Sequence, residues 1–395
     1  MEEECKKRNL LFSIHQLFRK VFVGKSSLGT YISKYVDGFT VNQYSNVKGF
    51  FWNIDNAASQ GHLELLQWLE TYRPGPCTVR AMDNAAGQGY LDVVQWLHIN
   101  RVEGCTVRAM NGAAENGHIH VLEWIHHHRN EGCTSNAMDR AAFRGHLQMV
   151  EWLHCNREEG CTTNAVDLAA RCGHLQVVEW LVSNCSKGHT HRAIDDAAFE
   201  GHTETVKWLH THGSEGCTTN AMDYAAKQGH LSLIKWLHHN REEGCTTKAM
   251  DEAARGGHLH VVEWLHKQRS EGCTSNAMDK AAQEGFLDVV EWLHSHRTEG
   301  CSTTAMDCAA YQGDLGMVKW LHQYRSEGCT RRSMNEAARK GNLEMVEWLF
   351  RNRAEVCAHS AKKRAKDEGH KHVAEWLHNA VLIRFAKEGT AKLNN

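Results

Sequence analysis

Proline is nearly absent from this chain, which has only two prolines in 395 residues. Because proline breaks a helix from within, so low a content favours long stretches of helix. The chain also lacks any run of about 18 apolar residues, the length that a membrane-spanning helix requires. Its formal net charge at pH 7 is −2, so it has no overall basic field to hold nucleic acid or an anionic membrane. We therefore expect a helical protein that binds neither nucleic acid nor membrane.

The N-terminal residues lack the pattern of a secretory signal. Segment 10–18 is interrupted by His15 and Gln16, whereas a signal requires an unbroken apolar stretch and a cleavage site with small residues. We therefore expect the protein in the cytoplasm. The basic run 362–366 leaves entry into the nucleus open as an alternative.

Tryptophan reveals a strict internal repeat. Only Trp52 is out of register, and a glycine recurs in the same register in every copy, from Gly61 to Gly369. An Ala-Ala pair recurs in all copies except the last. Counted from Gly49, twelve units of 28 residues follow one another without insertion or deletion. The tryptophans in register are Trp68, Trp96, Trp124, Trp152, Trp180, Trp208, Trp236, Trp264, Trp292, Trp320, Trp348 and Trp376.

Each unit begins with the pattern of a short amphipathic helix. In one copy, Thr246 is a suitable N-cap, because its hydroxyl can accept a hydrogen bond from the first turn. Met250, Ala253 and Ala254 follow at the spacing of one helix face. Gly257 then ends the helix, since glycine adopts the left-handed conformation that a helix C-terminus needs.

A second helix completes the unit. Leu259, Val262 and Leu265 form its predicted apolar stripe, joined by Val261 and Trp264, and a short polar turn leads to the next copy. Neither helix can bury its stripe alone, so neighbouring units must stack to form a continuous core.

This pattern resembles the ankyrin repeat. Residues 276–282, continuing into Gly285 and the pair Val289-Val290, are similar to the family's T-P-L-H-x-A-A-x-x-G-H-x-x-V-V-x-x-L-L pattern. The period is 28 residues rather than about 33, and the missing residues are those of the family's β-hairpin. Alanine replaces the motif proline, and aspartate replaces the motif histidine. The resemblance implies an all-α, right-stacked helix–turn–helix solenoid in which β-hairpin fingers are absent or reduced.

The expected organisation has three parts. Residues 1–48 lie outside the register but are rich in apolar residues, which predicts an N-terminal helical cap. Residues 49–384 hold the twelve ankyrin-like repeats, and residues 385–395 form a polar C-terminal tail.

Fifteen cysteines raise the question of disulfides or metal ligands. Equivalent positions in stacked repeats lie roughly 10 Å apart, whereas a disulfide requires Cα atoms within about 7 Å. We therefore interpret the cysteines in register as small buried residues of a reducing compartment. They are Cys77, Cys105, Cys133, Cys161, Cys217, Cys245, Cys273, Cys301, Cys329 and Cys357.

Histidines also follow the repeat. Some histidines directly follow a Trp-Leu pair, such as His98 and His154. We expect their rings to interact with the last backbone carbonyls of their own helix. The resemblance implies inter-repeat hydrogen bonding for the group that follows the recurrent glycine: His62, His118, His146, His174, His202, His230, His258 and His370.

One stretch departs from the repeat. Residues 182–189 replace the usual pattern, and with His191 and Cys172 they contain atoms that zinc can bind. The paired spacing of a zinc site is missing, so a local irregularity of the stack is the favoured interpretation, with metal binding as the alternative.

No catalytic motif is present, and we expect neither enzymatic activity nor a cofactor. An aspartate recurs at one position of the first helix, as in Asp83, Asp139, Asp223, Asp251, Asp279 and Asp307. A catalytic acid is not needed in so many copies. We interpret these residues as acids stabilised by the helix dipole.

Positions that vary between repeats are candidates for recognition. They lie just before and just after the Ala-Ala pair, at a spacing that places them on one face of the first helix. In ankyrin repeats this face lines the concave groove that binds partners. Aromatic and arginine residues are enriched at binding hot spots, although single exposed aromatics are also ordinary on any surface. The predicted binding residues are Arg140, Phe143, Arg144, Leu168, Arg171, Phe199, Tyr224, Lys227 and Tyr311.

The predicted function is that of a scaffold or adaptor, monomeric, that binds other proteins on this first-helix face. A stoichiometric inhibitor or regulatory subunit of an enzyme is the alternative, followed by a metal-binding protein rich in histidine and cysteine.

Overall fold

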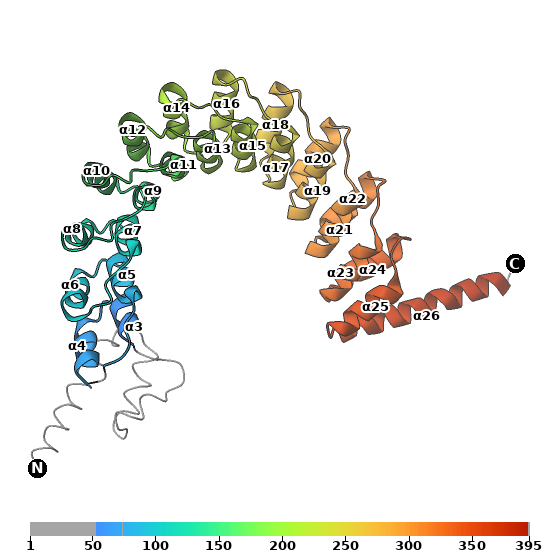
Figure 1. The fold of residues 1–395 in the computed structure, drawn as a ribbon. Helices are drawn as coiled ribbons and strands as arrows, with labels where there is room; N and C mark the ends of the chain where they lie inside the picture. The colour runs from blue at the N-terminus through green and yellow to red at the C-terminus, as the bar shows by residue number, and fades with distance from the viewer. Residues whose placement is uncertain (1–52, 73, 394–395) are drawn as a thin grey trace, which may run out of the picture. The chain divides into compact units, whose positions relative to one another are not determined.

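The computed structural model describes residues 53–72 and 74–393. These residues form 24 α-helices, α3 to α26, and contain no strand, which confirms the predicted all-α class (Figure 1). The cap predicted for residues 1–48 lies outside the described residues. The chain divides into two compact units, Met1–His189 and Thr190–Asn395, each of which is described by itself. The division falls in the stretch where the sequence departs from the repeat.

In the first unit, helices alternate between two rows (Figure 1). The first helices of the repeats are α3 (Ile54–Ser59), α5 (Val79–Gly87), α7 (Val107–Glu115), α9 (Asn136–Phe143) and α11 (Thr163–Arg171). The second helices are α4 (Leu63–Tyr72), α6 (Leu91–Asn100), α8 (Ile119–His128), α10 (Leu147–Asn156) and α12 (Leu175–Asn184).

The second unit repeats this alternation. Its first helices are α13 (Arg192–Glu200), α15 (Thr219–Lys227), α17 (Thr247–Arg255), α19 (Ser275–Glu284), α21 (Thr303–Gln312), α23 (Arg331–Arg339) and α25 (Ala358–Asp367). Its second helices are α14 (Thr203–His212), α16 (Leu231–Asn240), α18 (Leu259–Gln268), α20 (Leu287–His296), α22 (Leu315–Tyr324), α24 (Leu343–Asn352) and α26 (Lys371–Leu393).

Helix α17 shows why each first helix forms where it does. The Thr246 hydroxyl accepts a hydrogen bond from the backbone N–H of Lys248 at 3.2 Å and caps the helix, as predicted. Gly257 has a φ of +71° and reverses the chain after the last turn. Between them, the small Ala-Ala pair lets neighbouring first helices pack closely. The buried residues are Ala249, Met250, Asp251, Ala253 and Ala254.

The second helix buries a different stripe from the one expected. In α18 the buried residues are Val261, Val262 and Leu265, whereas Leu259 and Trp264 are only half-buried. The reason is that Leu259 is the first residue of the helix and lies beside the turn. The core of each repeat is therefore the Val-Val pair and a leucine, packed on the Met/Ala stripe.

First helices contact each other along the stack more extensively than second helices do. The small side chains of the first helices explain this difference, because they allow a closer approach than the bulkier tryptophan-bearing second helices. Within each unit, the row of first helices accordingly lies on the inner side of the curve (Figure 1).

Within the described residues, the stretch predicted as a polar C-terminal tail, 385–395, continues the last helix. Helix α26 runs from Lys371 to Leu393 and therefore continues through residues 385–393. This stretch contains no proline, and the helix continues through Gly389. Among the described residues, no helix is long and apolar enough to span a membrane.

Candidate functional site

The recurrent aspartates connect one repeat to the next. The Asp83 carboxylate accepts hydrogen bonds from the Thr106 backbone N–H at 2.7 Å and from its hydroxyl at 2.8 Å. The same arrangement joins Asp55 to Thr78, Asp139 to Thr162, Asp195 to Thr218, Asp223 to Thr246, Asp251 to Thr274, Asp279 to Ser302 and Asp307 to Thr330.

The interpretation of these acids as first-turn residues that serve the dipole of their own helix is wrong for five of the six, because only Asp139 lies in the first turn of its helix, α9. Asp83 is buried and lies beyond the first turn of α5. Its carboxylate instead holds the residue that caps the next first helix. Burial raises the pKa of Asp251, although hydrogen bonds from Thr274 oppose this effect. These carboxylates are structural, because their oxygens are already engaged.

The histidines after Trp-Leu also act between repeats rather than on their own helix. His98 Nδ1 lies 3.4 Å from the Arg129 guanidinium of the next repeat, and its ring meets Trp124 edge-on at 5.2 Å. Arg129 in turn pairs with Glu131. Burial alone would raise the pKa of Glu131, but the hydrogen bond and charge of Arg129 outweigh it and lower that pKa. The expected contact with carbonyls of the same helix occurs instead at other positions, such as His128 Nδ1 with the Trp124 carbonyl at 2.8 Å.

The histidines that follow the recurrent glycine pack against the preceding repeat. A Cβ added to Gly89 would lie 2.6 Å from the His118 ring, so the ring rests directly on the glycine. Burial lowers the pKa of His118. For His258, burial lowers the pKa and a hydrogen bond to the Lys227 backbone opposes the shift. Packing on that glycine is a shared role, to which a hydrogen bond is added in His258; the histidines that have it are His118, His146, His174, His230, His258 and His370.

Most cysteines in register are buried, as expected, but Cys357 is exposed and this part of the prediction is wrong. Cys357 precedes the first helix of the last repeat, α25, whose sequence AHSAKKRAKD is mostly polar. Burial raises the pKa of the Cys105 and Cys245 thiols to about 12. Within the described residues, no group of three histidine, cysteine or acidic side chains is placed to hold a metal ion.

The surface left for recognition is the exposed side of the first helices. We define the first-helix face as the four positions of each repeat that correspond to Asn136, Arg140, Phe143 and Arg144 of α9. None of the nine predicted binding residues is buried in the core. In α11, Leu168 is half-buried and Arg171 is exposed.

In the first unit, three predicted residues form a group that we call the Phe143 cluster: Arg140, Phe143 and Arg144. The Arg144 guanidinium lies over the Phe143 ring at 5.4 Å from its centroid. Both arginines reach Glu115 of the preceding repeat, Arg140 at 2.7 Å and Arg144 at 3.6 Å. Each arginine side chain remains more than half exposed, so these ion pairs leave donors available to a partner.

In the second unit, Phe199, Tyr224 and Lys227 come together as the Phe199 cluster. The two rings meet edge-on at 5.7 Å, and the Lys227 ammonium lies over Phe199 at 5.6 Å. Tyr311 stands apart from this cluster along the stack, with the Lys340 ammonium 3.7 Å from its ring centroid. Seven of the nine predicted residues therefore fall into separate groups, each with a cation over an aromatic ring, whereas Leu168 and Arg171 belong to none of them.

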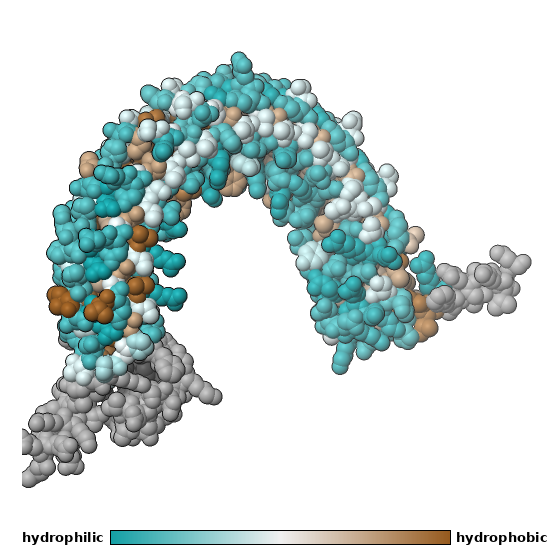
Figure 2. Space-filling model, viewed as in Figure 1, coloured by the Kyte–Doolittle hydropathy of each residue, from teal (hydrophilic) through white to brown (hydrophobic). Residues whose placement is uncertain are grey.

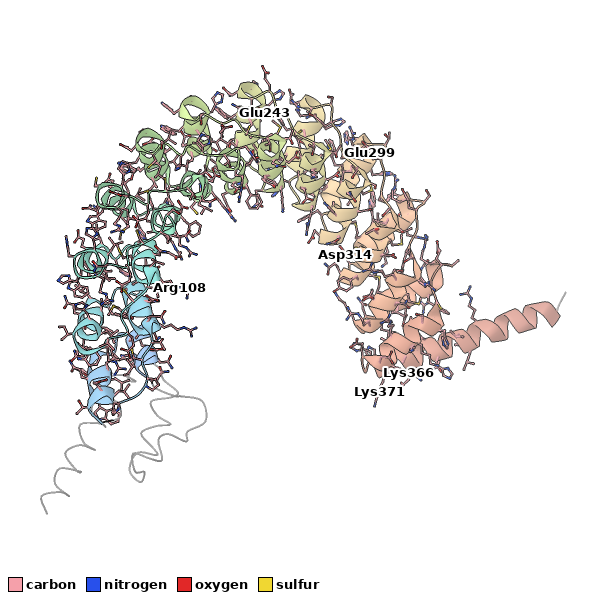
Figure 3. All side chains as sticks on the ribbon, viewed as in Figure 1. Arg108, Glu243, Glu299, Asp314, Lys366 and Lys371 are labelled. Atoms are coloured by element: carbon pink, nitrogen blue, oxygen red, sulfur yellow. The ribbon has the colours of Figure 1, made fainter. Side chains whose placement is uncertain are left out.

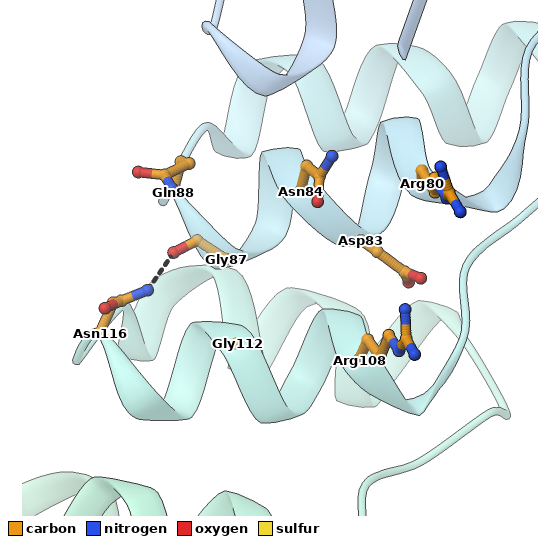
Figure 4. A pocket seen from close by; sticks show the side chains of 8 residues that line it. All are labelled: Arg80, Asp83, Asn84, Gly87, Gln88, Arg108, Gly112 and Asn116. Carbon is orange, nitrogen blue, oxygen red and sulfur yellow. Dashed lines mark hydrogen bonds between the residues drawn. The ribbon is translucent and has the colours of Figure 1, made fainter. Parts of the chain in front are cut away.

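A hollow that the sequence analysis missed opens between α5 and α7 (Figure 4). Its volume is about 290 Å³. It exists because Gly87 and Gly112 stand at the positions that Phe143 and Arg140 occupy in α9. The two glycines nearly touch, since a Cβ on Gly112 would lie 3.1 Å from the Gly87 Cα. The lining residues are Arg80, Asp83, Asn84, Gly87, Gln88, Arg108, Gly112 and Asn116.

Comparison with known families supports the assignment of the repeat. A family model described as "Ankyrin repeats (many copies)" matches residues 112–154, 138–182, 194–238, 222–266, 250–294 and 278–322, which together span just over half of the 395 residues. The chain belongs to the ankyrin-repeat family. Curated proteins, in contrast, provide no match to the chain. Ankyrin repeats are generally protein–protein interaction modules.

In the ankyrin repeats of the first unit, the first-helix face is rich in arginine. From α5 to α11 it carries a single acid, Glu115. The remaining acids of these helices, Asp83, Asp139 and Asp167, are buried. Arg108 projects from this side of the first unit, whereas Glu243 and Glu299 of the second unit lie among the second helices and turns (Figure 3). The arginines of the face are Arg80, Arg108, Arg140, Arg144 and Arg171.

Outside the first-helix face, the ankyrin surface is largely hydrophilic, with apolar residues in small separate spots (Figure 2). Ile99 and Val102 are the most exposed of these, at 78% and 99% of their area. Isolated exposed apolar residues are common on protein surfaces and indicate no site by themselves.

Proposed function

We propose that the protein is a non-enzymatic scaffold or adaptor that binds partner proteins through the first-helix face of its ankyrin repeats. One contrast carries this proposal. The buried positions of the first helices repeat nearly unchanged, whereas the four positions of the first-helix face differ from copy to copy. The fold requires only the buried residues of the first helices. The residues at the exposed positions are therefore free to vary and are available for recognition.

The Phe143 cluster is the proposed contact centre of the first unit. Phe143 offers a half-buried ring fixed by Arg144, and Arg140 and Arg144 offer exposed guanidinium groups. An aromatic ring with arginines beside it is typical of residues that contribute most to binding energy. The Phe199 cluster is the corresponding group of the second unit.

We further propose that the protein acts as a monomer in the cytoplasm. The cysteine chemistry agrees with this location, because the buried Cys105 and Cys133 are free thiols, as expected in a reducing compartment. The fold without strands in its described residues offers no exposed sheet edge there through which copies could join.

Affinity capture with paired variants tests the proposal. Full-length wild type, Phe143→Ala/Arg140→Ala and Phe199→Ala would be used to capture partners from the source cell, with quantitative mass spectrometry as the readout. We expect at least one partner to be lost from one variant. Tyr324→Ala is the matched control, because Tyr324 is an aromatic residue 49% exposed on second helix α22. Equal recovery of every partner by all four proteins would reject the first-helix face as the binding surface.

A further inference from the structure

The hollow between α5 and α7 differs chemically from the rest of the first-helix face. The neighbouring α9 fills the same positions with Arg140 and Phe143, whereas here two glycines leave the space open. At about 290 Å³, the hollow can hold one or two side chains but no larger folded element. It is therefore suited to a short extended segment that places a side chain between the two helices.

Hydrogen-bond donors dominate the lining. Arg80 and Arg108 are exposed, and neither forms an ion pair with another described residue. Asp83 lies at the base, but both of its oxygens accept hydrogen bonds from Thr106. The Asn116 amide donates to the Gly87 carbonyl at 2.7 Å, which occupies that acceptor (Figure 4).

The guanidinium of Arg108 points toward Arg80 and Asp83, so the two arginines flank one end of the hollow (Figure 4). An arginine can hold a carboxylate through two parallel hydrogen bonds, which are stronger than those between neutral groups. The side-chain amides of Asn84 and Gln88 add neutral donors along the rest of the lining.

We propose that this hollow binds a carboxylate of an acidic peptide segment in a partner protein. The inference rests on the proposed function, because it names the chemistry of a partner for the same first-helix face. Charge complementarity extends beyond the hollow, since Arg140, Arg144 and Arg171 continue the basic face along the first unit. The carboxylate comes either from an Asp or Glu side chain or from a chain's C-terminus.

An acidic peptide fits this site better than a nucleic acid does. Single-stranded nucleic acid is held largely by bases stacked on aromatic side chains. The hollow has none, because Gly87 and Gly112 occupy the positions where rings occur in other repeats.

Peptide selection on the full chain tests the inference. A displayed library of random octamers, with free and with amidated C-termini, would be panned against the immobilised protein. We expect selected peptides to carry Asp or Glu at a fixed position, or to require the free C-terminus, and the two library forms distinguish these carboxylates. Fluorescence anisotropy of the selected peptides should then show binding roughly tenfold or more weaker for Arg80→Gln/Arg108→Gln.

Gly87→Phe fills the hollow and provides the decisive variant. A Cβ at Gly87 would make only an ordinary 3.7 Å contact with Gly112, and its φ is not left-handed, so the backbone accepts a side chain there. We expect Gly87→Phe to abolish the acid preference, while Gly87→Ala and the exposed, equivalent Arg332→Gln of α23 retain it.

The outcomes separate this inference from the proposed function. Peptides that bind without acidic preference, or that depend on Phe143 but not on Gly87, would overturn the inference and leave the proposed function standing. An oligonucleotide that binds through Arg80 and Arg108, with no acidic peptide selected, would overturn the peptide assignment. Failure to select any peptide on wild type would overturn the inference, and the affinity capture with the Phe143 and Phe199 variants would then test the proposed function separately.

Discussion

Asp139 and Thr162 join two successive repeats through both oxygens of one carboxylate. Asp139 Oδ1 accepts a hydrogen bond from the Thr162 backbone N–H at 2.8 Å, and Oδ2 accepts one from the Thr162 hydroxyl at 2.6 Å. The same hydroxyl caps α11 by accepting from the Asn164 N–H at 3.2 Å. One aspartate therefore positions the start of the next first helix, and with it the next portion of the first-helix face.

Removing this carboxylate should destabilise the stack. Asp139 is only 4% exposed, so Asp139→Ala leaves the Thr162 N–H and hydroxyl without an acceptor inside the structure. We expect Asp139→Ala to lower the free energy of unfolding by about 2–4 kcal/mol. Urea denaturation followed by tryptophan fluorescence would measure the change.

Asp139→Asn is the matched control, since the chain already contains this substitution. In the preceding repeat, Asn111 Oδ1 accepts from the Thr134 N–H at 3.0 Å and its amide donates to the Thr134 hydroxyl at 2.9 Å. The asparagine variant should therefore cost about 1 kcal/mol or less. A similar loss in both variants would show that charge, rather than hydrogen-bond geometry, is what the position requires.

The sequence predicted the elements that depend on local patterns. The Met250 and Ala253 spacing identified the buried face of α17, and Gly257 marked its end, because both signals lie within a few residues of each other. The partner of Asp139 could not be predicted, since Thr162 is distant along the chain and meets it only when repeats stack. The repeat register predicted which positions of the first helices are exposed. It could not predict contacts between adjacent repeats, such as that of the Phe199 ring with Tyr224.

The hollow was missed for a different physical reason. It arises from side chains that are absent, whereas the predicted binding residues are large or charged. The signal was present in the sequence, because Gly87 and Gly112 are glycines at positions where other repeats place a ring or an arginine. Their closeness, however, depends on the packing of α5 against α7.

Ring packing on the recurrent glycine can be measured by comparing two adjacent repeats. Gly257 and Gly285 have φ values of +71° and +86°, so alanine strains the backbone at both. A Cβ on Gly257 would also lie 2.6 Å from the Phe286 ring, whereas one on Gly285 would lie 3.6 Å from Asp314. Gly257→Ala should therefore lower the free energy of unfolding by about 1–3 kcal/mol more than Gly285→Ala. If urea denaturation gives both variants the same loss of unfolding free energy, then the Phe286 ring moves aside without an energetic cost.

Acid should weaken the stack through histidines that the fold keeps neutral. Burial and the charge of Arg269 lower the pKa of His238 from its ordinary value of 6.5. The unfolded chain therefore binds a proton near pH 6.5 that the folded protein does not. The stability contributed by neutral His238 is complete above pH 6.5 and is lost as the pH falls from there toward the folded pKa.

Urea midpoints at pH 7.5, 6.5 and 5.5 would test this pH dependence. Wild type should lose stability across the range, and His238→Gln should lose less, because the variant lacks the group that titrates. His212→Gln, at an exposed position stacked on Trp208, gives the comparison at a second histidine. A His238→Gln profile parallel to wild type would exclude His238 as a source of the acid sensitivity.

The irregular stretch of the first unit, residues 182–189, lacks the arginine–glutamate pair that recurs in other repeats. Around Gly132 and the equivalent glycines, the arginine of the next repeat lies against the glycine and pairs with a glutamate. Beside Gly160 nothing lies within 4 Å of an added Cβ, because Cys185 occupies the arginine position and Lys187 the glutamate position. Cys185 Sγ reaches only to 4.0 Å from His154 Nδ1.

Restoring the arginine–glutamate pair at positions 185 and 187 should stabilise the protein. In Cys185→Arg/Lys187→Glu, the new guanidinium can occupy the open space beside Gly160, contact His154 and pair with the new glutamate. Because such partly exposed ion pairs contribute modestly, we expect the free energy of unfolding to rise by about 0.5–1 kcal/mol. Ser186→Arg adds an arginine at an exposed position of the same turn and should change stability little. If the double variant is no more stable than this control, then the pattern at 185 and 187 does not limit the stability of this repeat.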